Sequence, residues 1–223
     1  MNLNKLGEAL LFFVPFLFSL SFHEAAHAYL AEKRGDPTAR ILGRVTINPI
    51  PHIDILGTII FPLISIIWGG LFFGWAKPVP VNPLNLKNYK KDNLLISLAG
   101  PVSNLILAVI FALLIKISSV VYPNQIYSYF RGNSGIFDYP IITMLDLGIR
   151  LNITLALFNL IPIPPLDGSH ILEGVLPNRF SSFFEQYKQI GFYVFMFLLL
   201  SGVLKYLSYP IGLIYISLLG VFL

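Results

Sequence analysis

Long apolar runs alternate with short polar connections along the chain. A membrane-spanning helix needs about 20 predominantly apolar residues. Four runs approach or exceed that length, and a C-terminal stretch has room for one or two more; they cover about residues 6–31, 55–75, 94–117, 141–161 and 189–223. The pattern predicts an all-α polytopic membrane protein with about five or six transmembrane helices.

The connections hold the turn-forming residues. The first run ends at Gly35 and Pro37, where a helix should stop. Residues 40–48 then alternate loosely between apolar and polar positions, which indicates a short strand or hairpin. Residues 77–83 hold three prolines, which forbid a helix and favour an extended edge segment. We therefore expect short extended or β segments beside the helices.

The runs leave no room for a separate soluble domain, and the chain shows no internal repeat. We expect a single domain over residues 1–223. Its core should cover residues 6–175, and residues 181–223 should form accessory C-terminal helices.

The composition indicates that a lipid bilayer is the main solvent. Hydrophobic residues make up 56% of the chain and charged residues only 12%, about half of the roughly 25% found in soluble domains. The absence of cysteine excludes disulfides and thiolate metal sites, so metal ligands must be His, Asp or Glu. The formal charge of +4 comes from basic residues in short loops, which indicates contact with the bilayer and no nucleic-acid partner.

The strongest local signal is the sequence His23-Glu24-Ala25-Ala26-His27 in the first run. Helical positions i and i+4 lie on one face about 5–6 Å apart, so both imidazoles can reach one zinc ion at about 2.0–2.1 Å. Glu24 can then act as general base towards a metal-bound water. Three ionisable groups inside a membrane segment are costly, and a shared metal would account for all of them. A polar turn at the membrane interface is the alternative.

Catalytic zinc usually takes three protein ligands, so one is missing from this motif. Asp167 is the best candidate, because residues 159–168 contain three prolines that break a membrane helix just before it. Irregular backbone at membrane depth persists only where protein or a wet cavity surrounds it, and Gly168 permits a sharp turn. An ordinary Asp-Gly surface turn is the plainer interpretation. Other ionisable candidates remain, namely Asp146 (which could instead pair with Arg150), His52, Asp54 and His170.

Three motifs together resemble the site-2 protease family of intramembrane zinc metalloproteases, in its compact prokaryotic form without a PDZ domain. The first is His23 to His27. The second is Asn159-x-x-Pro-x-Pro-x-x-Asp167-Gly168, and the third is Gly100-Pro101-x-x-Asn104. Their order and spacing across three apolar runs are far more specific than any one of them.

The resemblance implies an enzyme, an intramembrane zinc endopeptidase with one Zn²⁺ per chain. His23, His27 and Asp167 would be the zinc ligands and Glu24 the general base. Asn159 would hold the substrate backbone or stabilise the oxyanion, and Asn104 would be a packing or hydrogen-bonding residue.

The resemblance further implies a multi-pass protein of the cell membrane whose substrate is a transmembrane protein. Residues 77–83 would lie near the active site, where they could pair with an unwound substrate. We expect no PDZ-like insertion between the second and third runs, and the apolar end at Leu223 predicts no soluble C-terminal regulatory domain.

Two other functions compete with this interpretation. A metal-ion transporter or channel could use the same three ligands as a transit site. A membrane-anchored zinc protease could instead have its site in water, with Glu173 as the third ligand. The sequence assigns no oligomeric state.

Overall fold

The structure is a computed structural model that describes residues 3–68 and 74–222. Its long helices are α1 (Leu3–Lys33), α4 (Tyr89–Val121), α6 (Pro140–Asn159), α8 (Ser181–Ser201) and α9 (Ser208–Phe222). Shorter α-helices are α2 (Thr38–Ile41), α3 (Phe61–Trp68), α5 (Pro123–Phe130) and α7 (Asp167–Val175). Single turns complete the described part: η1 (Ile50–His52), the π-helical η2 (Ile55–Ile60), η3 (Pro83–Asn85), η4 (Asn178–Phe180) and η5 (Val203–Leu207).

The predicted all-α membrane class is confirmed. Among the described residues four helical segments, compared with the five or six expected, are long and apolar enough to cross a bilayer, namely Gly7–Lys33, Tyr89–Val121, Pro140–Asn159 and Val203–Phe222. The apolar run expected at 55–75 begins as η2 and continues as α3, and residues 69–73 lie outside the described part. The single-domain prediction for residues 1–223 stays a prediction.

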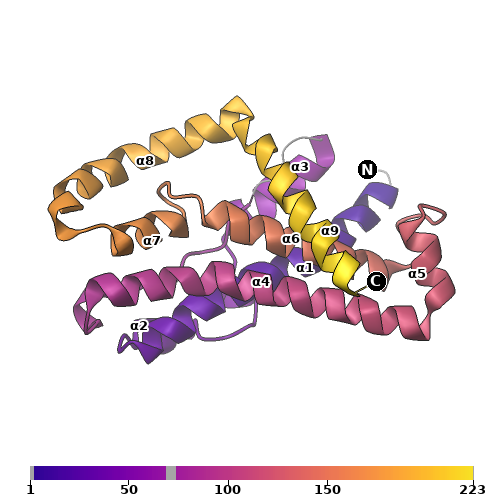
Figure 1. Cartoon of the computed structure of the whole chain (residues 1–223), viewed down its shortest axis with the longest axis horizontal. Helices are drawn as coiled ribbons and strands as arrows, with labels where there is room; N and C mark the ends of the chain where they lie inside the picture. Colours follow the sequence, from indigo (N-terminus) through magenta and orange to yellow (C-terminus); the bar gives the residue numbers. More distant parts are fainter. Residues whose placement is uncertain (1–2, 69–73, 223) are drawn as a thin grey trace.

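Helices α1, α4 and α6 pack against one another and form the centre of the bundle, and α7 packs along α4 (Figure 1). Helix α8 lies at the outer edge of the view and packs mainly against η4 and η5. Close contact between α4 and α6 depends on Gly148, where an added Cβ would lie 2.6 Å from the Phe111 ring. An apolar cluster that includes Ile115, Ile149 and Ile153, each 0% exposed, fills this interface.

The strand or hairpin predicted for residues 40–48 is wrong. These residues form the end of α2 followed by turns. The buried Asp36 carboxylate accepts hydrogen bonds from the Thr38 amide (3.1 Å) and hydroxyl (2.5 Å) at the start of α2. Gly43, with φ of 67°, then reverses the chain. Such local side-chain bonds compete with strand pairing, and the described residues supply no partner strand.

The extended conformation predicted for residues 77–83 agrees with the structure. The backbone before η3 is extended, with Asn82 at φ −95° and ψ 110°. No strand pairs with it among the residues that the structure describes. This segment is therefore extended but unpaired among the described residues, and several of its backbone groups bond to Arg44, His52, Glu24 and Asp36.

Candidate active site

The two histidines of the first motif lie one turn apart on α1 and turn their rings towards the same point. Both side chains are buried, with 5% of His23 and 8% of His27 exposed. Their Nε2 atoms are 3.0 Å apart. Helical spacing alone brings these atoms close, because residues i and i+4 share a face.

Asp167 reaches the same point from the connection between α6 and α7. The prolines after Asn159 end α6, and α7 begins at Asp167 itself. Gly168 makes the turn possible, since an added Cβ would collide with the carbonyl oxygens of Leu160 and Ile161. As a result the Asp167 Oδ2 atom lies 3.2 Å from His23 Nε2 and 3.3 Å from His27 Nε2.

The ligand atoms of His23, His27 and Asp167 all lie within 4.8 Å of one another. Asp167 Oδ2 is buried and has no hydrogen-bond donor among the described residues. A buried carboxylate oxygen without a donor is costly, whereas a cation between these three atoms would balance its charge. The arrangement therefore fits a metal ion.

The far side of each imidazole supports this interpretation. His27 Nδ1 lies 2.7 Å from the Ile96 carbonyl oxygen, which can only accept, so this nitrogen carries the proton. His23 Nδ1 lies 2.5 Å from Asn104 Oδ1 and donates to it. Both Nε2 atoms are then free of hydrogen and direct lone pairs at the common point. Histidine ligands of metals are generally oriented by such outer partners.

Asn104 is held in turn by a buried polar chain. Its Nδ2 donates to Asn152 Oδ1 at 2.7 Å and to the Ser19 carbonyl at 3.3 Å. Asn152 Nδ2 donates to the Ser19 hydroxyl at 2.8 Å and to the Gly148 carbonyl at 2.8 Å. These bonds fix which end of the Asn104 amide faces His23. The prediction that Asn104 is a hydrogen-bonding residue is confirmed, whereas the sequence analysis missed Asn152 and Ser19.

Gly100 gives the imidazoles their space. It lies on α4 opposite α1, and a Cβ at this position would collide with the rings of both His23 and His27. A glycine is therefore required where α4 passes the site. This requirement explains the glycine of the third motif.

Glu24 is half-buried beside the cluster and contacts the extended edge. Its Oε2 accepts a hydrogen bond of 3.0 Å from the Val79 backbone amide, 55 residues away in the sequence. The predicted general base therefore lies where α1 meets residues 77–83.

Asn159, at the end of α6, is half-buried and donates from Nδ2 to the Leu155 carbonyl at 3.0 Å. The second hydrogen on Nδ2 and the Oδ1 atom have no partner among the described residues, so the side chain can still bind a peptide group. Its role towards substrate stays a prediction.

The alternative ligand candidates all lie elsewhere. Asp146 pairs with Arg150 at 3.2 Å, as expected from their spacing. The Glu173 carboxylate pairs with Lys188 at 3.1 Å and lies 3.6 Å from His170 Nδ1. Asp54 caps the start of η2, and His52 Nε2 donates a hydrogen bond to the Thr46 carbonyl at 2.8 Å.

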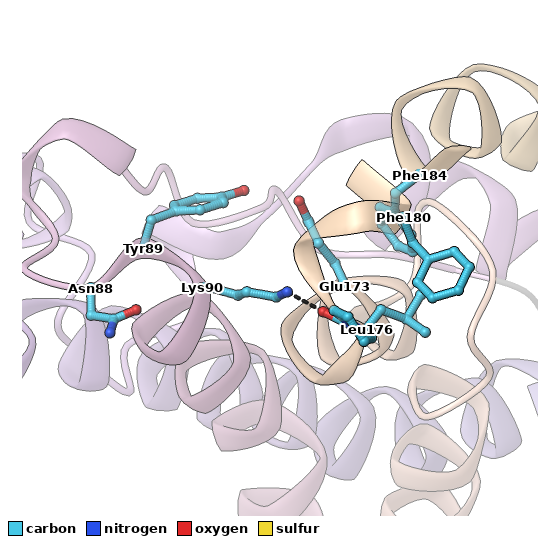
Figure 2. A pocket seen from close by; sticks show the side chains of 8 residues that line it. Asn88, Tyr89, Lys90, Glu173, Leu176, Phe180 and Phe184 are labelled. Carbon is cyan, nitrogen blue, oxygen red and sulfur yellow. Dashed lines mark hydrogen bonds between the residues drawn. The ribbon is translucent and has the colours of Figure 1, made fainter. Parts of the chain in front are cut away.

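A surface hollow of about 300 Å³ lies at the other end of α7, between the start of α4 and η4. Figure 2 shows Glu173, Phe180 and Phe184 on one side of it and Asn88 and Tyr89 on the other, with the Lys90 ammonium donating to the Leu176 carbonyl. None of the three convergent ligands lines this hollow.

The family model of peptidase family M50 matches residues 11–202. YwhC of Bacillus subtilis, named as an inferred zinc metalloprotease, is 38% identical over 198 residues, which are 88% of this chain and 83% of YwhC.

Two more distant relatives carry similar names. Rip2 of Mycolicibacterium smegmatis, also named as an inferred zinc metalloprotease, is 28% identical over 91% of this chain and 71% of its own length. The zinc metalloprotease MJ0392 of Methanocaldococcus jannaschii is 26% identical over 79% of this chain and 37% of its own length. No solved structure matches the chain.

Proposed function

The chain belongs to peptidase family M50, the site-2 protease family, and is a membrane-embedded zinc metalloprotease; on this premise we propose that it cleaves membrane proteins within or beside a transmembrane segment. The observation that carries the proposal is the convergence of His23, His27 and Asp167 inside the bundle, next to Glu24. We place the enzyme in the cell membrane, with one zinc ion per chain.

The three convergent side chains would hold the zinc through the two Nε2 atoms and the Asp167 carboxylate. Two neutral imidazoles and one carboxylate form a donor set of the kind that zinc proteases use, with one position left for water or substrate. When bound, zinc lowers the pKa of a coordinated water to about 7 and polarises the scissile carbonyl.

Glu24 would handle the proton. Its Oε2 is occupied by the Val79 amide, and its Oε1 has no partner among the described residues. That oxygen can take the proton of the attacking water and return it to the amide nitrogen of the leaving chain. Asn159 would donate its remaining amide hydrogen to the substrate backbone or to the oxyanion.

The extended edge offers a place for the substrate. A helical substrate must unwind before its peptide bond is exposed, because each amide is bonded within the helix. In the described structure the Val79 carbonyl and both backbone groups of Val81 have no hydrogen-bond partner. They alternate along one edge, as strand addition requires, and the same segment touches Glu24. Strand addition here would present the substrate next to the base.

A metal transporter with the same ligands is not favoured. Family membership is to peptidases. Transit of an ion also requires successive ligand sites, and the described residues contain one group of three convergent ligands.

The test is the Glu24→Gln variant, which keeps the size of the side chain and its contact with Val79. The purified variant should retain one zinc per chain, while cleavage of a transmembrane substrate in liposomes falls by about 10²–10⁴-fold. Glu32→Gln is the matched control, because Glu32 lies on the same helix and pairs with Arg40 at the surface. Full activity of Glu24→Gln would remove Glu24 from the mechanism.

A further inference from the structure

The contact between Glu24 and Val79 depends on how the extended segment is held. Val79 stands between Pro78 and Pro80, so it carries the only backbone amide hydrogen of these three residues. That hydrogen is donated to the Glu24 carboxylate. The position of a single amide therefore sets the position of one carboxylate oxygen.

Arg44 holds this segment in place. Its guanidinium donates to three backbone carbonyls: Pro51 through Nη1, and Lys77 and Pro78 through Nη2, with the last bond at 3.0 Å. The Lys77 amide also donates to the His52 carbonyl at 2.9 Å. The loop after α2 is thus joined to the residues immediately before Val79.

Burial of this arginine is unusual. Only 5% of Arg44 is exposed, and it forms no salt bridge with a carboxylate among the described residues. Burial lowers the pKa of Arg44, and the negative charge of Glu24 opposes that effect. A buried cation without a directly paired anion is costly, so its position calls for a reason. The charge of Glu24 and the three carbonyls supply one.

We propose that Arg44 is a positioning residue for the catalytic base: by binding the carbonyls of Lys77 and Pro78, it presents the Val79 amide to Glu24. This inference rests on the proposed function, because it assigns Glu24 as the base. The Val79 amide then occupies Oε2 and leaves Oε1 without a partner among the described residues. Arg44 itself touches neither substrate nor metal ligands.

The chemistry requires arginine at this position. A planar guanidinium has five donors in a fixed arrangement and can bind several carbonyls together, whereas a lysine ammonium is a point charge on a flexible stem. Arg44→Lys keeps the charge but loses the fixed arrangement. It therefore separates positioning from simple electrostatics.

The experiment measures two quantities on the full chain in detergent or liposomes. The first is hydrogen exchange of the Val79 amide, followed by NMR of protein labelled with ¹⁵N-valine and without substrate. The second is cleavage, resolved into kcat and KM, together with zinc content. Arg44→Lys should lower kcat by roughly 10–10²-fold and accelerate Val79 exchange, with KM and zinc content within about twofold of the original values.

Two further variants keep the test decisive. Arg40→Lys is the matched control, since Arg40 is exposed and pairs with Glu32, and it should change nothing. Glu24→Ala removes the acceptor without altering either loop, so Val79 exchange should again accelerate. If that exchange rate is unchanged in Glu24→Ala, or if kcat of Arg44→Lys is unchanged, the proposal is overturned.

Failure of the proposed function would look different. If the chain bound no zinc and cleaved no substrate, the protease assignment would be refuted. The contact between Glu24 and Val79 would then have no catalytic role either. Zinc-loaded, active enzyme with an unprotected Val79 amide would refute only the role of Arg44.

Discussion

Two carboxylates near α6, those of Asp146 and Asp167, lie in the apolar bundle in contrasting environments. Asp146 lies within α6 and is surrounded by donors: Arg150 Nε at 3.2 Å, the Tyr129 hydroxyl at 3.3 Å and the Tyr215 hydroxyl. Asp167 follows the end of α6, and its buried Oδ2 has no donor and faces two imidazole nitrogens.

The difference separates a structural carboxylate from one suited to bind a cation. The protein itself satisfies Asp146, since the Arg150 guanidinium also lies 3.8 Å from the centre of the Tyr215 ring and ties α6 to α9. Asp167 is half-buried, and its buried Oδ2 atom lacks such compensation among the described residues, which is tolerable where a metal completes the site. Burial of an acidic residue is thus uninformative until its partners are known.

Removing the Asp167 or the Asp146 carboxylate should give the largest difference between the two sites, in zinc content and in stability. Asp167→Ala should reduce bound zinc to background and abolish cleavage, because one of three ligands is gone. Asp146→Ala should retain one zinc per chain but lose about 2–3 kcal/mol of stability, since two tyrosine hydroxyls and a half-exposed arginine lose their acceptor. Zinc analysis and thermal unfolding in detergent measure the two effects. Equal zinc loss in both variants would erase the distinction.

The outer partner of His23 should show an intermediate effect. Asn104→Leu removes the acceptor of the His23 Nδ1 hydrogen, and the imidazole is then free to change tautomer and turn. Zinc affinity, measured by competition with a chelator, should fall about 10–100-fold.

Ser103→Ala is the control for this variant. Ser103 is the buried neighbour on α4, and among the described residues its hydroxyl bonds only the Gly100 carbonyl, at 2.7 Å. Zinc affinity should stay within about twofold. An Asn104→Leu variant with normal affinity would show that the buried amide chain does not orient the site.

The smallest effect is expected at the structural carboxylate. Tyr215→Phe removes one hydrogen bond to Asp146 and should cost about 1–2 kcal/mol of stability, without change in zinc content or cleavage. Tyr209→Phe, on the same helix but 73% exposed, should leave the unfolding temperature unchanged. A loss of zinc in Tyr215→Phe would mean that the two carboxylate sites are coupled.

Part of the fold and of the site could be predicted from the sequence, because it depends on interactions between residues close together in the chain. The all-α membrane class follows from run length, and the proximity of His23 and His27 follows from helix geometry. The pairing of Asp146 with Arg150 follows from the same i, i+4 rule. The failure at residues 40–48 has a local cause as well, because Asp36 accepts hydrogen bonds from Thr38 at the start of α2.

Two other residues of the site carry a signal in the sequence. Ser19 and Asn152 are polar residues within apolar runs, and polar groups in such runs generally need partners. Their presence could have predicted a buried polar chain, though not which residues it would join.

The sequence by itself determined which residues could act: two histidines and a glutamate on one helix, and an aspartate freed by prolines from another. Only the tertiary structure decided that the Asp167 oxygen faces both imidazoles and that Asn104 orients His23. It also decided that the Val79 amide bonds Glu24 and that Arg44 binds the carbonyls of Lys77 and Pro78. Helical spacing and proline breaks act over a few residues, so a single sequence reveals them. Contacts between distant segments depend on how whole helices pack, including where Gly100 and Gly148 let them approach, and no short pattern encodes that packing.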